Sequence, residues 1–268
     1  MSIQKPSPDA LSPVASRRLD GKVALVTGSS RGIGAAIARL FASHGARVAI
    51  HGRDRDALAA VRSQLESEGA RVLDVAADVT RFAELEAMRA RIEDRLGPIE
   101  ILVANAGGNL TPPHSPIEEI SEDGWRASVD ANLTGTFLTL KSILPGMKAR
   151  RSGRVVTVSS AAARRPTAMS PAPYTAAKAG IQLLTQVAAA QAGPFGVRVN
   201  CIAPETILTE DNTRQIPPEV QNRLADEHPL RRLGTPNDVA EAALFLVSDA
   251  AEWLTGLVLD VAGGSVLR

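Results

Sequence analysis

The stretch KVALVTGSSRGIGAAIARLFASHG, residues 22–45, joins a short apolar run to a longer amphipathic segment through a turn that contains three glycines. The apolar run, residues 22–28, shows no alternation of polar and apolar side chains, which is typical of a strand covered on both faces. The segment that follows, residues 32–45, ends at a glycine, as many helices do. This stretch therefore predicts a buried strand, a tight turn and a helix.

The same alternation continues along most of the chain. The predicted strands cover residues 22–28, 47–52, 71–77, 100–107, 154–160, 197–204 and 256–263. The predicted helices cover residues 32–45, 56–69, 82–97, a pair around 117–150, 174–193 and 237–249. Strict alternation implies right-handed crossovers and a parallel sheet with helices on both faces. We therefore expect an α/β protein with a single-domain Rossmann fold, a doubly wound seven-stranded parallel sheet.

Composition and charge argue against several classes of function. The 268 residues carry a net charge of +1 and only 3% aromatic residues, which disfavours a nucleic-acid surface. No apolar run reaches the roughly 18 residues that a membrane span requires. The single cysteine, Cys201, cannot form an intrachain disulfide and favours a reducing compartment. We expect a cytoplasmic protein that acts on a small molecule and binds neither nucleic acid nor membrane.

Residues 1–18 differ from the rest of the chain. They are rich in Pro, Ser and Ala without a continuous apolar run, so we interpret them as a flexible tail and not as a secretory signal. No linker or repeat interrupts the pattern after them, and residues 19–268 are expected to form one domain. The four histidines show no metal-ligand spacing, so we expect structural or surface roles for them and no metal site.

The turn after the first strand points to a nucleotide. Gly28, Gly32 and Gly34 fall between strand and helix with the spacing T-G-x3-G-x-G. Glycine lets the backbone turn sharply and approach a pyrophosphate, while the helix N-terminus offers unpaired N–H groups. Glycines also punctuate ordinary turns, but their place after the first strand of an alternating α/β chain favours phosphate binding.

Two further strand ends agree with this interpretation. The third strand is followed by Asp78 and Val79, where the carboxylate could hydrogen-bond an adenine amino group. The fourth ends in Asn105, Ala106 and Gly107, which let the backbone come close to a ribose. Ligands of open α/β sheets bind at the carboxyl ends of the strands, so these residues should share one dinucleotide site.

The end of the second strand bears on which dinucleotide binds. NAD-binding folds of this kind place an acidic residue there, whereas this chain has Gly52 followed by Arg53. Arginine clamps a 2′-phosphate with paired, charge-assisted hydrogen bonds, and Arg31 in the glycine turn is a second cation. Asp54 is an opposing signal, although it also suits the N-cap of the next helix. The pattern favours NADP(H) and leaves NAD(H) as the alternative.

Tyr174 and Lys178 end the stretch SSAAARRPTAMSPAPYTAAK, residues 159–178, and helical spacing places them on one face about one turn apart. A nearby ammonium stabilises a phenolate, so we expect the pKa of Tyr174 to be lowered toward neutrality. Such a tyrosine exchanges a proton with a carbonyl or alcohol oxygen while hydride moves to or from nicotinamide. A surface tyrosine and lysine give the same spacing by chance, so the pair is weak evidence on its own.

Taken together, the motifs resemble those of the single-domain short-chain dehydrogenase/reductases. The resemblance runs through TGSSRGIG, ADV, NAG, DANLTGTF and the C-terminal TGLVLDVAGG, in the family's order from about residue 20 onward. It is strongest with the 3-oxoacyl-[acyl-carrier-protein] reductase-like branch. The resemblance implies a homotetramer assembled through helices with small-residue faces and through the C-terminal strand.

The resemblance also implies roles for individual residues. The catalytic set that it implies is Asn132, Ser160, Tyr174 and Lys178. Asn132 would help to hold a water of a proton relay, and Lys178 would also bind the nicotinamide ribose. Ile207 and Thr209 match positions that meet the nicotinamide carboxamide. With the motifs above, the cofactor-binding residues are Gly28, Ser30, Arg31, Gly32, Ile33, Gly34, Arg53, Asp78, Val79, Asn105, Ala106, Gly107, Tyr174, Lys178, Pro204, Ile207 and Thr209.

The catalytic serine departs from the family in its spacing. Thirteen residues separate Ser160 from Tyr174, one more than the family usually has. Successive strand side chains point to opposite faces, so Ser159 and Ser160 cannot both face a substrate. The family pattern selects Ser160, and a one-residue insertion in the loop between it and the tyrosine is easily tolerated. Ser170 is too near Tyr174 to replace it, although it could line the pocket.

A second departure follows the sixth strand, where the family commonly has Pro-Gly and this chain has Pro204-Glu205. We expect the Glu205 side chain to point to solvent; the alternative is that it biases the site against anionic substrates. Residues 205–230, the longest irregular stretch, and residues 108–116 are expected to form the substrate lobe or lid.

The function expected from these residues is NADP(H)-dependent hydride transfer between nicotinamide and a ketone or secondary alcohol, with Tyr174 as general acid/base. The first alternative is an NAD(H)-dependent dehydrogenase of a sugar, sugar acid or steroid alcohol. A dinucleotide-binding protein without catalysis is the second, and the complete Asn-Ser-Tyr-Lys set argues against it.

Overall fold

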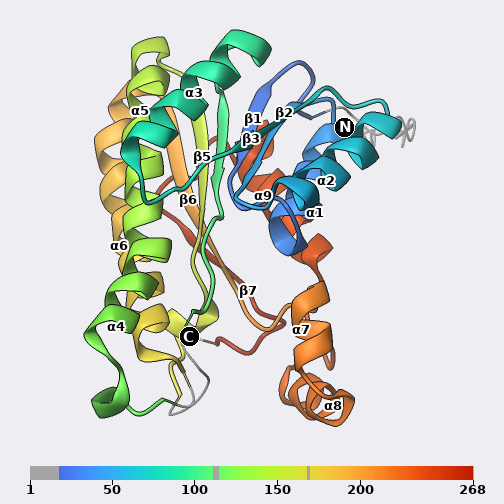
Figure 1. The fold of residues 1–268 in the computed structure, drawn as a ribbon, viewed down its shortest axis with the longest axis vertical. Coiled ribbons are helices and arrows are strands. Elements are labelled where there is room, and N and C mark those ends of the chain that lie inside the picture. Colours follow the sequence, from blue (N-terminus) through green and yellow to red (C-terminus); the bar gives the residue numbers. More distant parts are fainter. Residues whose placement is uncertain (1–17, 111–114, 168–169, 268) are drawn as a thin grey trace, which may run out of the picture.

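A single parallel sheet forms the centre of the protein, seen in a computed structural model that describes residues 18–110, 115–167 and 170–267. Seven strands are paired in the order β3-β2-β1-β4-β5-β6-β7 (Figure 1). The strands are β1 (Val23–Val26), β2 (Arg47–Gly52), β3 (Val72–Ala76), β4 (Ile101–Ala104), β5 (Gly153–Val158), β6 (Val197–Pro204) and β7 (Val258–Val261). The predicted seven-stranded Rossmann fold is therefore confirmed.

Helices cover both faces of this sheet, so that the molecule has three layers (Figure 1). The α-helices of the described residues are α1 (Gly32–Ser43), α2 (Arg55–Ser67), α3 (Phe82–Leu96), α4 (Glu122–Val129), α5 (Gly135–Arg150), α6 (Ala172–Ala192), α7 (Glu210–Gln215), α8 (Pro218–Glu227) and α9 (Pro236–Val247). One face is covered by α1, α2 and α9, and the other by α3, α5 and α6. A π-helical turn, η2 (Asp130–Thr134), joins α4 to α5.

Alternating side chains of each central strand supply two separate cores. In β1, Ala24 and Val26 pack with α1 and α9, whereas Val23 and Leu25 pack on the opposite face with α3. All four are fully buried. Burying a Val or Leu side chain stabilises the folded state by about 1.5–3 kcal/mol. In a strand covered on both faces, every apolar side chain adds to this stability. This explains why the predicted strands are apolar throughout instead of alternating.

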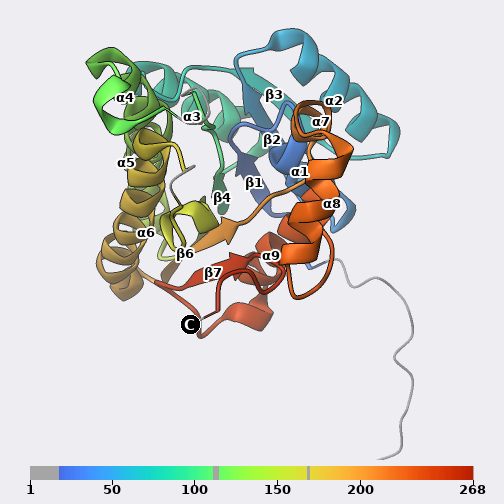
Figure 2. The same cartoon turned by 90° about the horizontal axis from the view of Figure 1, so that it is seen from below.

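The topology places a binding crevice beside β1. From β1 the chain proceeds outward to β2 and β3, and it then returns to β4 on the other side of β1. The helices that follow these two neighbouring strands therefore lie on opposite faces, and the carboxyl ends between them are left accessible. Figure 2 shows α7 and α8 on one side of this end of the molecule, with α4 and α6 on the other.

The structure differs in some details from the prediction. Residues 205–230 are not irregular, because they contain α7 and α8. Thr209 caps α7 by accepting a hydrogen bond from the backbone of Asn212, and Pro218 begins α8, where proline is well tolerated. Of the predicted tail, only Arg18 lies within the described residues, and residues 111–114 of the predicted lid also lie outside them. No helix in the described ranges is long and apolar enough to cross a bilayer.

Candidate active site

The turn between β1 and α1 is built so closely that it requires glycine. Gly28 has a φ of +65°, and a Cβ there would lie 2.8 Å from the Cα of Ala106. A Cβ on Gly34 would lie 2.2 Å from the carbonyl oxygen of Gly28. Gly32 has a φ of +56° and would bring a Cβ to 3.2 Å from Thr209. The three glycines thus let the turn, α1 and the residues after β4 and β6 approach one another.

The N-terminus of α1 remains able to receive an anion. Arg31, which precedes the helix, makes no side-chain capping hydrogen bond, and the first turn contains no acidic residue. The initial N–H groups of a helix lack intrahelical partners and carry partial positive charge. This end of α1 therefore suits a phosphate group.

Asn105 closes the glycine turn from the end of β4. Its backbone N–H donates to the Thr27 hydroxyl at 3.0 Å. Its side-chain Nδ2 donates to the carbonyl oxygens of Thr27 and Gly28, both at 3.0 Å. The Asn105 side chain therefore fixes the turn, and Gly107 after it has a φ of +140°, a backbone conformation that favours glycine.

His51 supports the same turn from β2, which the sequence analysis did not single out. Its Nδ1 accepts a hydrogen bond from the backbone N–H of Gly28 at 3.3 Å, and its Nε2 lies 3.1 Å from the carbonyl oxygen of Ala77. These contacts define the neutral tautomer with the proton on Nε2. Burial lowers the pKa of His51 to about 4. The only available signal was a polar residue inside an apolar strand, next to Gly52.

A cavity of about 550 Å³ opens beside this turn. It collects eight of the predicted cofactor residues. They are Gly28, Ser30, Arg31, Arg53, Asp78, Val79, Ala106 and Gly107. The carboxylate of Asp78 accepts hydrogen bonds from the backbone and hydroxyl of Thr80, and these bonds hold its pKa below the usual value.

Some of the charged side chains at the mouth of this cavity already form ion pairs with one another. The Arg31 guanidinium lies 2.8 Å from Asp54 and 4.0 Å from Asp211 of α7. Asp54 also accepts a hydrogen bond from the backbone of Ala57, so it caps α2 as predicted. Arg53 is exposed and lines the same cavity. Arg53 is therefore more available to a ligand than Arg31.

A second cavity, also of about 550 Å³, adjoins the first, since Gly107 and Gly108 line both. It contains three of the four predicted catalytic residues, Ser160, Tyr174 and Lys178. Predicted cofactor residues that line it are Ile33, Asn105, Gly107, Pro204, Ile207 and Thr209. The two cavities together run across the carboxyl ends of the central strands.

Tyr174 and Lys178 share one face of α6 near its start. The Lys178 ammonium lies 5.5 Å from the centre of the Tyr174 ring and donates to the carbonyl oxygen of Val158 at 2.9 Å. Lys178 is only 4% exposed, and this burial lowers its pKa to about 8. The pKa of Tyr174 is raised by burial, not lowered as we expected. The expectation was wrong because it neglected the cost of burying a phenolate.

The two neighbouring serines both line the second cavity, but their hydroxyls make different contacts. Ser159 is buried, and its hydroxyl donates to the carbonyl oxygen of Lys178 at 2.7 Å. Ser160 follows β5 and lies in the second cavity, where a hydrogen bond with the Tyr174 hydroxyl partly offsets the raised pKa of the phenol. Ser170 also lines this cavity. The geometry therefore favours Ser160 over Ser159.

Asn132 lies behind the place where the two cavities meet. It is fully buried in the π-helical turn η2, a feature often found at functional sites. Its Oδ1 accepts from the backbone of Gly108 at 3.0 Å, and its Nδ2 donates to the carbonyl oxygens of Gly108 and Ser128, both at 2.9 Å. It lines neither cavity, and its side chain holds the Gly107–Gly108 backbone in position.

Glu205 does not simply point to solvent. Its side chain is half-buried and lines the second cavity together with Ser160 and Tyr174. Its carboxylate accepts a hydrogen bond from the Thr206 hydroxyl at 3.2 Å. The negative charge of Glu205 contributes, after burial, to the raised pKa of Tyr174. The expectation of an outward-pointing side chain was therefore wrong.

Comparison with known proteins agrees with this geometry. The family model described as Enoyl-(Acyl carrier protein) reductase matches residues 28–265. The 7alpha-hydroxysteroid dehydrogenase of Escherichia coli (strain K12) is 35% identical over 249 residues, which cover 93% of this chain and 96% of that protein. The cis-4-hydroxycyclohexanecarboxylate dehydrogenase of Sinomonas cyclohexanicum is 40% identical over 246 residues, covering 91% and 96%.

Solved structures give the same result. A structure described as a putative gluconate dehydrogenase from Agrobacterium tumefaciens superposes with a TM-score of 0.88 at 34% identity, covering 94% of this chain and 99% of that one. A 3-oxoacyl-[acyl-carrier protein] reductase with bound NAD from Brucella melitensis gives a TM-score of 0.86 at 34% identity, covering 100% and 99%. The chain belongs to the short-chain dehydrogenase/reductase family. It is an oxidoreductase of the type that acts on an alcohol or a ketone.

Proposed function

We propose that this protein is an NADP(H)-dependent oxidoreductase that transfers hydride between nicotinamide and a ketone or secondary alcohol, with Tyr174 as general acid/base. One observation carries the proposal. The cavity that contains Ser160, Tyr174 and Lys178 adjoins, at Gly107 and Gly108, the cavity beside the glycine turn. A reacting carbon and a dinucleotide could therefore meet in one continuous space.

The residues of the first cavity fit a dinucleotide. A Cβ on Gly28 or Gly34 would collide with backbone, so glycine at both positions gives the tight turn that would bring backbone close to a pyrophosphate. The uncapped start of α1 supplies N–H donors for the phosphates. Ile207 and Thr209 line the second cavity, where they would hold the nicotinamide carboxamide. When bound, the nicotinamide supplies the hydride donor or acceptor.

The chain's own residues would handle the proton. Ser160 would hold the substrate oxygen beside the Tyr174 hydroxyl, to which it is hydrogen-bonded. Because burial raises the pKa of Tyr174, the phenol stays protonated at neutral pH and can donate its proton to a ketone oxygen. Lys178 would bind the nicotinamide ribose and stabilise the phenolate that remains. Asn132 would position Gly107 and Gly108 between the two cavities, and it would also help to hold the water of a proton relay.

The preference for NADP(H) rests on Arg53. Its exposed guanidinium lies at the cavity that would receive the adenosine ribose, and Gly52 occupies the position where an acid would repel a 2′-phosphate. The ion pair between Arg31 and Asp54 favours the alternative, an NAD(H)-dependent dehydrogenase of a sugar, sugar acid or steroid alcohol, because it withdraws one cation from the phosphate.

Two further parts of the molecule take roles in this proposal. We assign the substrate lobe to residues 205–230, since α7 begins directly after Thr209 and Glu227 of α8 lines the catalytic cavity. We assign a homotetramer to this chain, because Phe137, Leu183 and Val187 expose large apolar side chains on α5 and α6.

The test is a spectrophotometric screen of ketones and 3-oxoacyl thioesters with NADPH and NADH, using the wild-type protein and Tyr174→Phe. The variant should lose turnover by more than about 100-fold, the range of a missing general acid, while it binds NADPH as the wild type does. Ser170→Ala removes another hydroxyl that lines the same cavity and should retain most activity. Retained turnover in Tyr174→Phe would contradict the mechanism.

A further inference from the structure

Glu205 occupies a fixed position at the end of the sheet. It directly follows Pro204, the last residue of β6, and its backbone N–H donates to the carbonyl oxygen of Val261 in β7 at 3.1 Å. The carboxylate is tied to the neighbouring Thr206 hydroxyl. The backbone of Glu205 is therefore fixed at the ends of two strands, and its carboxylate is hydrogen-bonded to the next residue.

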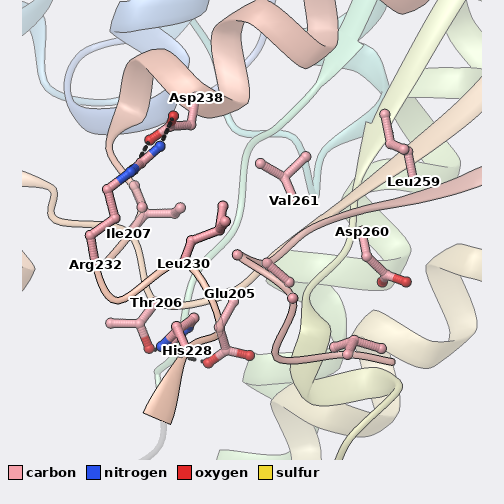
Figure 3. Close-up of a pocket in the computed structure, with 15 residues that line it drawn as sticks. Glu205, Thr206, Ile207, His228, Leu230, Arg232, Asp238, Leu259, Asp260 and Val261 are labelled. Carbon is pink, nitrogen blue, oxygen red and sulfur yellow. Dashed lines mark hydrogen bonds and ion pairs between the residues drawn. The ribbon is translucent and has the colours of Figure 1, made fainter. Parts of the chain in front are cut away.

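The carboxylate lies in the wall between two hollows. Glu205, Thr206 and Ile207 line both the catalytic cavity and a further cavity of about 410 Å³ on the side of β7. Figure 3 shows Glu205 beside Thr206 and His228 in this outer cavity. Since the same residue borders the space that contains Ser160 and Tyr174, its charge acts on whatever occupies that space.

No cation compensates this charge among the ion pairs of the described residues. Arg232, which lines the outer cavity, is bound by both carboxylate oxygens of Asp238 at 2.8 and 2.7 Å (Figure 3). Two cations, Arg165 and Lys178, line the catalytic cavity, but neither is paired with Glu205: Arg165 donates to the carbonyl oxygen of Ser265 and Lys178 to that of Val158. The influence of Glu205 on the pKa of Tyr174 indicates that its field reaches the catalytic hydroxyl.

We propose that Glu205 is a specificity-determining residue that makes the active site select neutral or amine-bearing alcohols and ketones over those that carry a carboxylate or phosphate near the reacting carbon. The inference rests on the proposed function, because it assigns the substrate of the same cavity. A carboxylate in a half-buried wall repels a second anion and attracts an ammonium, and such like-charge repulsion is a common means of rejecting a wrong ligand.

The first test compares three oxidations at the same ring: 4-methylcyclohexanol, 4-aminocyclohexanol and 4-hydroxycyclohexanecarboxylate. The wild type should prefer the amine to the carboxylate in kcat/KM. Glu205→Gln should raise the ratio of carboxylate to amine by about 10- to 100-fold, the range expected for loss of one charged contact, with little change for the neutral alcohol. Glu241→Gln removes an exposed carboxylate from α9, outside both cavities, and should leave the ratio unchanged.

The second test needs no turnover. Calorimetry on the NADP-loaded protein measures binding of cyclohexylamine and cyclohexanecarboxylate to the wild type and to Glu205→Gln. The amine should bind the wild type more tightly, and the difference should disappear in the variant. Equal binding of both probes to the wild type, or an unchanged preference in Glu205→Gln, would overturn the inference. A charge preference in binding without turnover of any alcohol would retain the inference and reject the proposed function.

Discussion

The backbone N–H of Gly28 donates a hydrogen bond to Nδ1 of His51 at 3.3 Å, and this contact joins the glycine turn after β1 to the buried end of β2. The opposite nitrogen, Nε2, lies 3.1 Å from the carbonyl oxygen of Ala77 after β3. One imidazole thus links three neighbouring strands at the floor of the proposed dinucleotide site. The contact with Gly28 requires the neutral ring, because a protonated Nδ1 would face the N–H of Gly28 with a second donor, whereas Nε2 donates to Ala77 in either state.

This arrangement predicts that stability falls in mild acid. The folded pKa of His51 is about 4, against 6.5 for an ordinary histidine. Between these values the unfolded chain takes up a proton that the folded chain does not, so the free energy of unfolding decreases as pH falls from 6.5 to about 4. Above 6.5 the ring is neutral in both states and contributes no dependence.

Urea unfolding at pH 7.5 and pH 5.0 measures this effect. His51→Asn keeps an acceptor near Gly28 and removes the titration. The wild type should lose about 2 kcal/mol more than the variant between these two pH values, as follows from the two pKa values of His51. The carboxylates titrate in both proteins and cancel in the comparison. Equal losses in both proteins would disprove a neutral, buried His51.

Arg53 should determine the cofactor preference more than Arg31 does. Arg53→Asp is expected to lower kcat/KM for NADPH relative to NADH by about 10- to 100-fold, because a charge-assisted contact is replaced by repulsion of the 2′-phosphate. Arg31→Ala should have a smaller effect, since Arg31 is already paired with Asp54. Arg55→Asp makes the same charge change on the exposed first turn of α2 and serves as the control. An unchanged preference in Arg53→Asp would reject the assignment.

Gly34 should tolerate no side chain. In Gly34→Ala the new Cβ would lie 2.2 Å from the carbonyl oxygen of Gly28, which is backbone and cannot move aside without displacing the turn. We expect a loss of about 1–3 kcal/mol in the free energy of unfolding, as in other overpacked sites, together with weaker NADPH binding. Gly193→Ala, where a Cβ meets nothing within 4 Å, is the matched control. Similar stability of the two variants would show that α1 can move away from the turn.

The two directions of the reaction should depend differently on pH. Burial and the negative charge of Glu205 raise the pKa of Tyr174, and the hydrogen bond from Ser160 lowers it. Lys178, whose pKa is about 8, faces the same ring, and the Cys201 thiol lies near that lysine. Alcohol oxidation needs the phenolate and should increase with pH through the alkaline range. Ketone reduction needs the phenol and should decrease there.

Glu205→Gln provides the check on this pH dependence. Removal of the negative charge lowers the pKa of Tyr174, so the rise of alcohol oxidation should move to lower pH than in the wild type. The profile of kcat/KM for oxidation of a neutral alcohol measures the shift. A profile that stays in place would show that Glu205 does not act on the catalytic hydroxyl.

Much of the fold could be predicted because it depends on local pattern. Strands such as β1 are apolar throughout, and they are buried on both faces. Positions 28 and 34 must be glycine because a Cβ there would clash with backbone atoms, and the spacing of Gly28 and Gly34 therefore revealed the turn. The segment after β6 was harder to predict, because α7 and α8 are short and start at Thr209 and Pro218 within a stretch rich in proline.

The fold class, the glycine turn and the pair of Tyr174 and Lys178 could be predicted because each depends on residue type and spacing within one or two consecutive elements. The electrostatics of the site became visible only in the folded molecule. The raised pKa of Tyr174 and the lowered pKa values of Lys178 and His51 follow from burial among strands and helices far apart in the chain. The placement of Glu205 in the cavity wall likewise depends on β6, β7 and α6 meeting at one end of the sheet, because charge interactions depend on distance and desolvation and not on sequence separation.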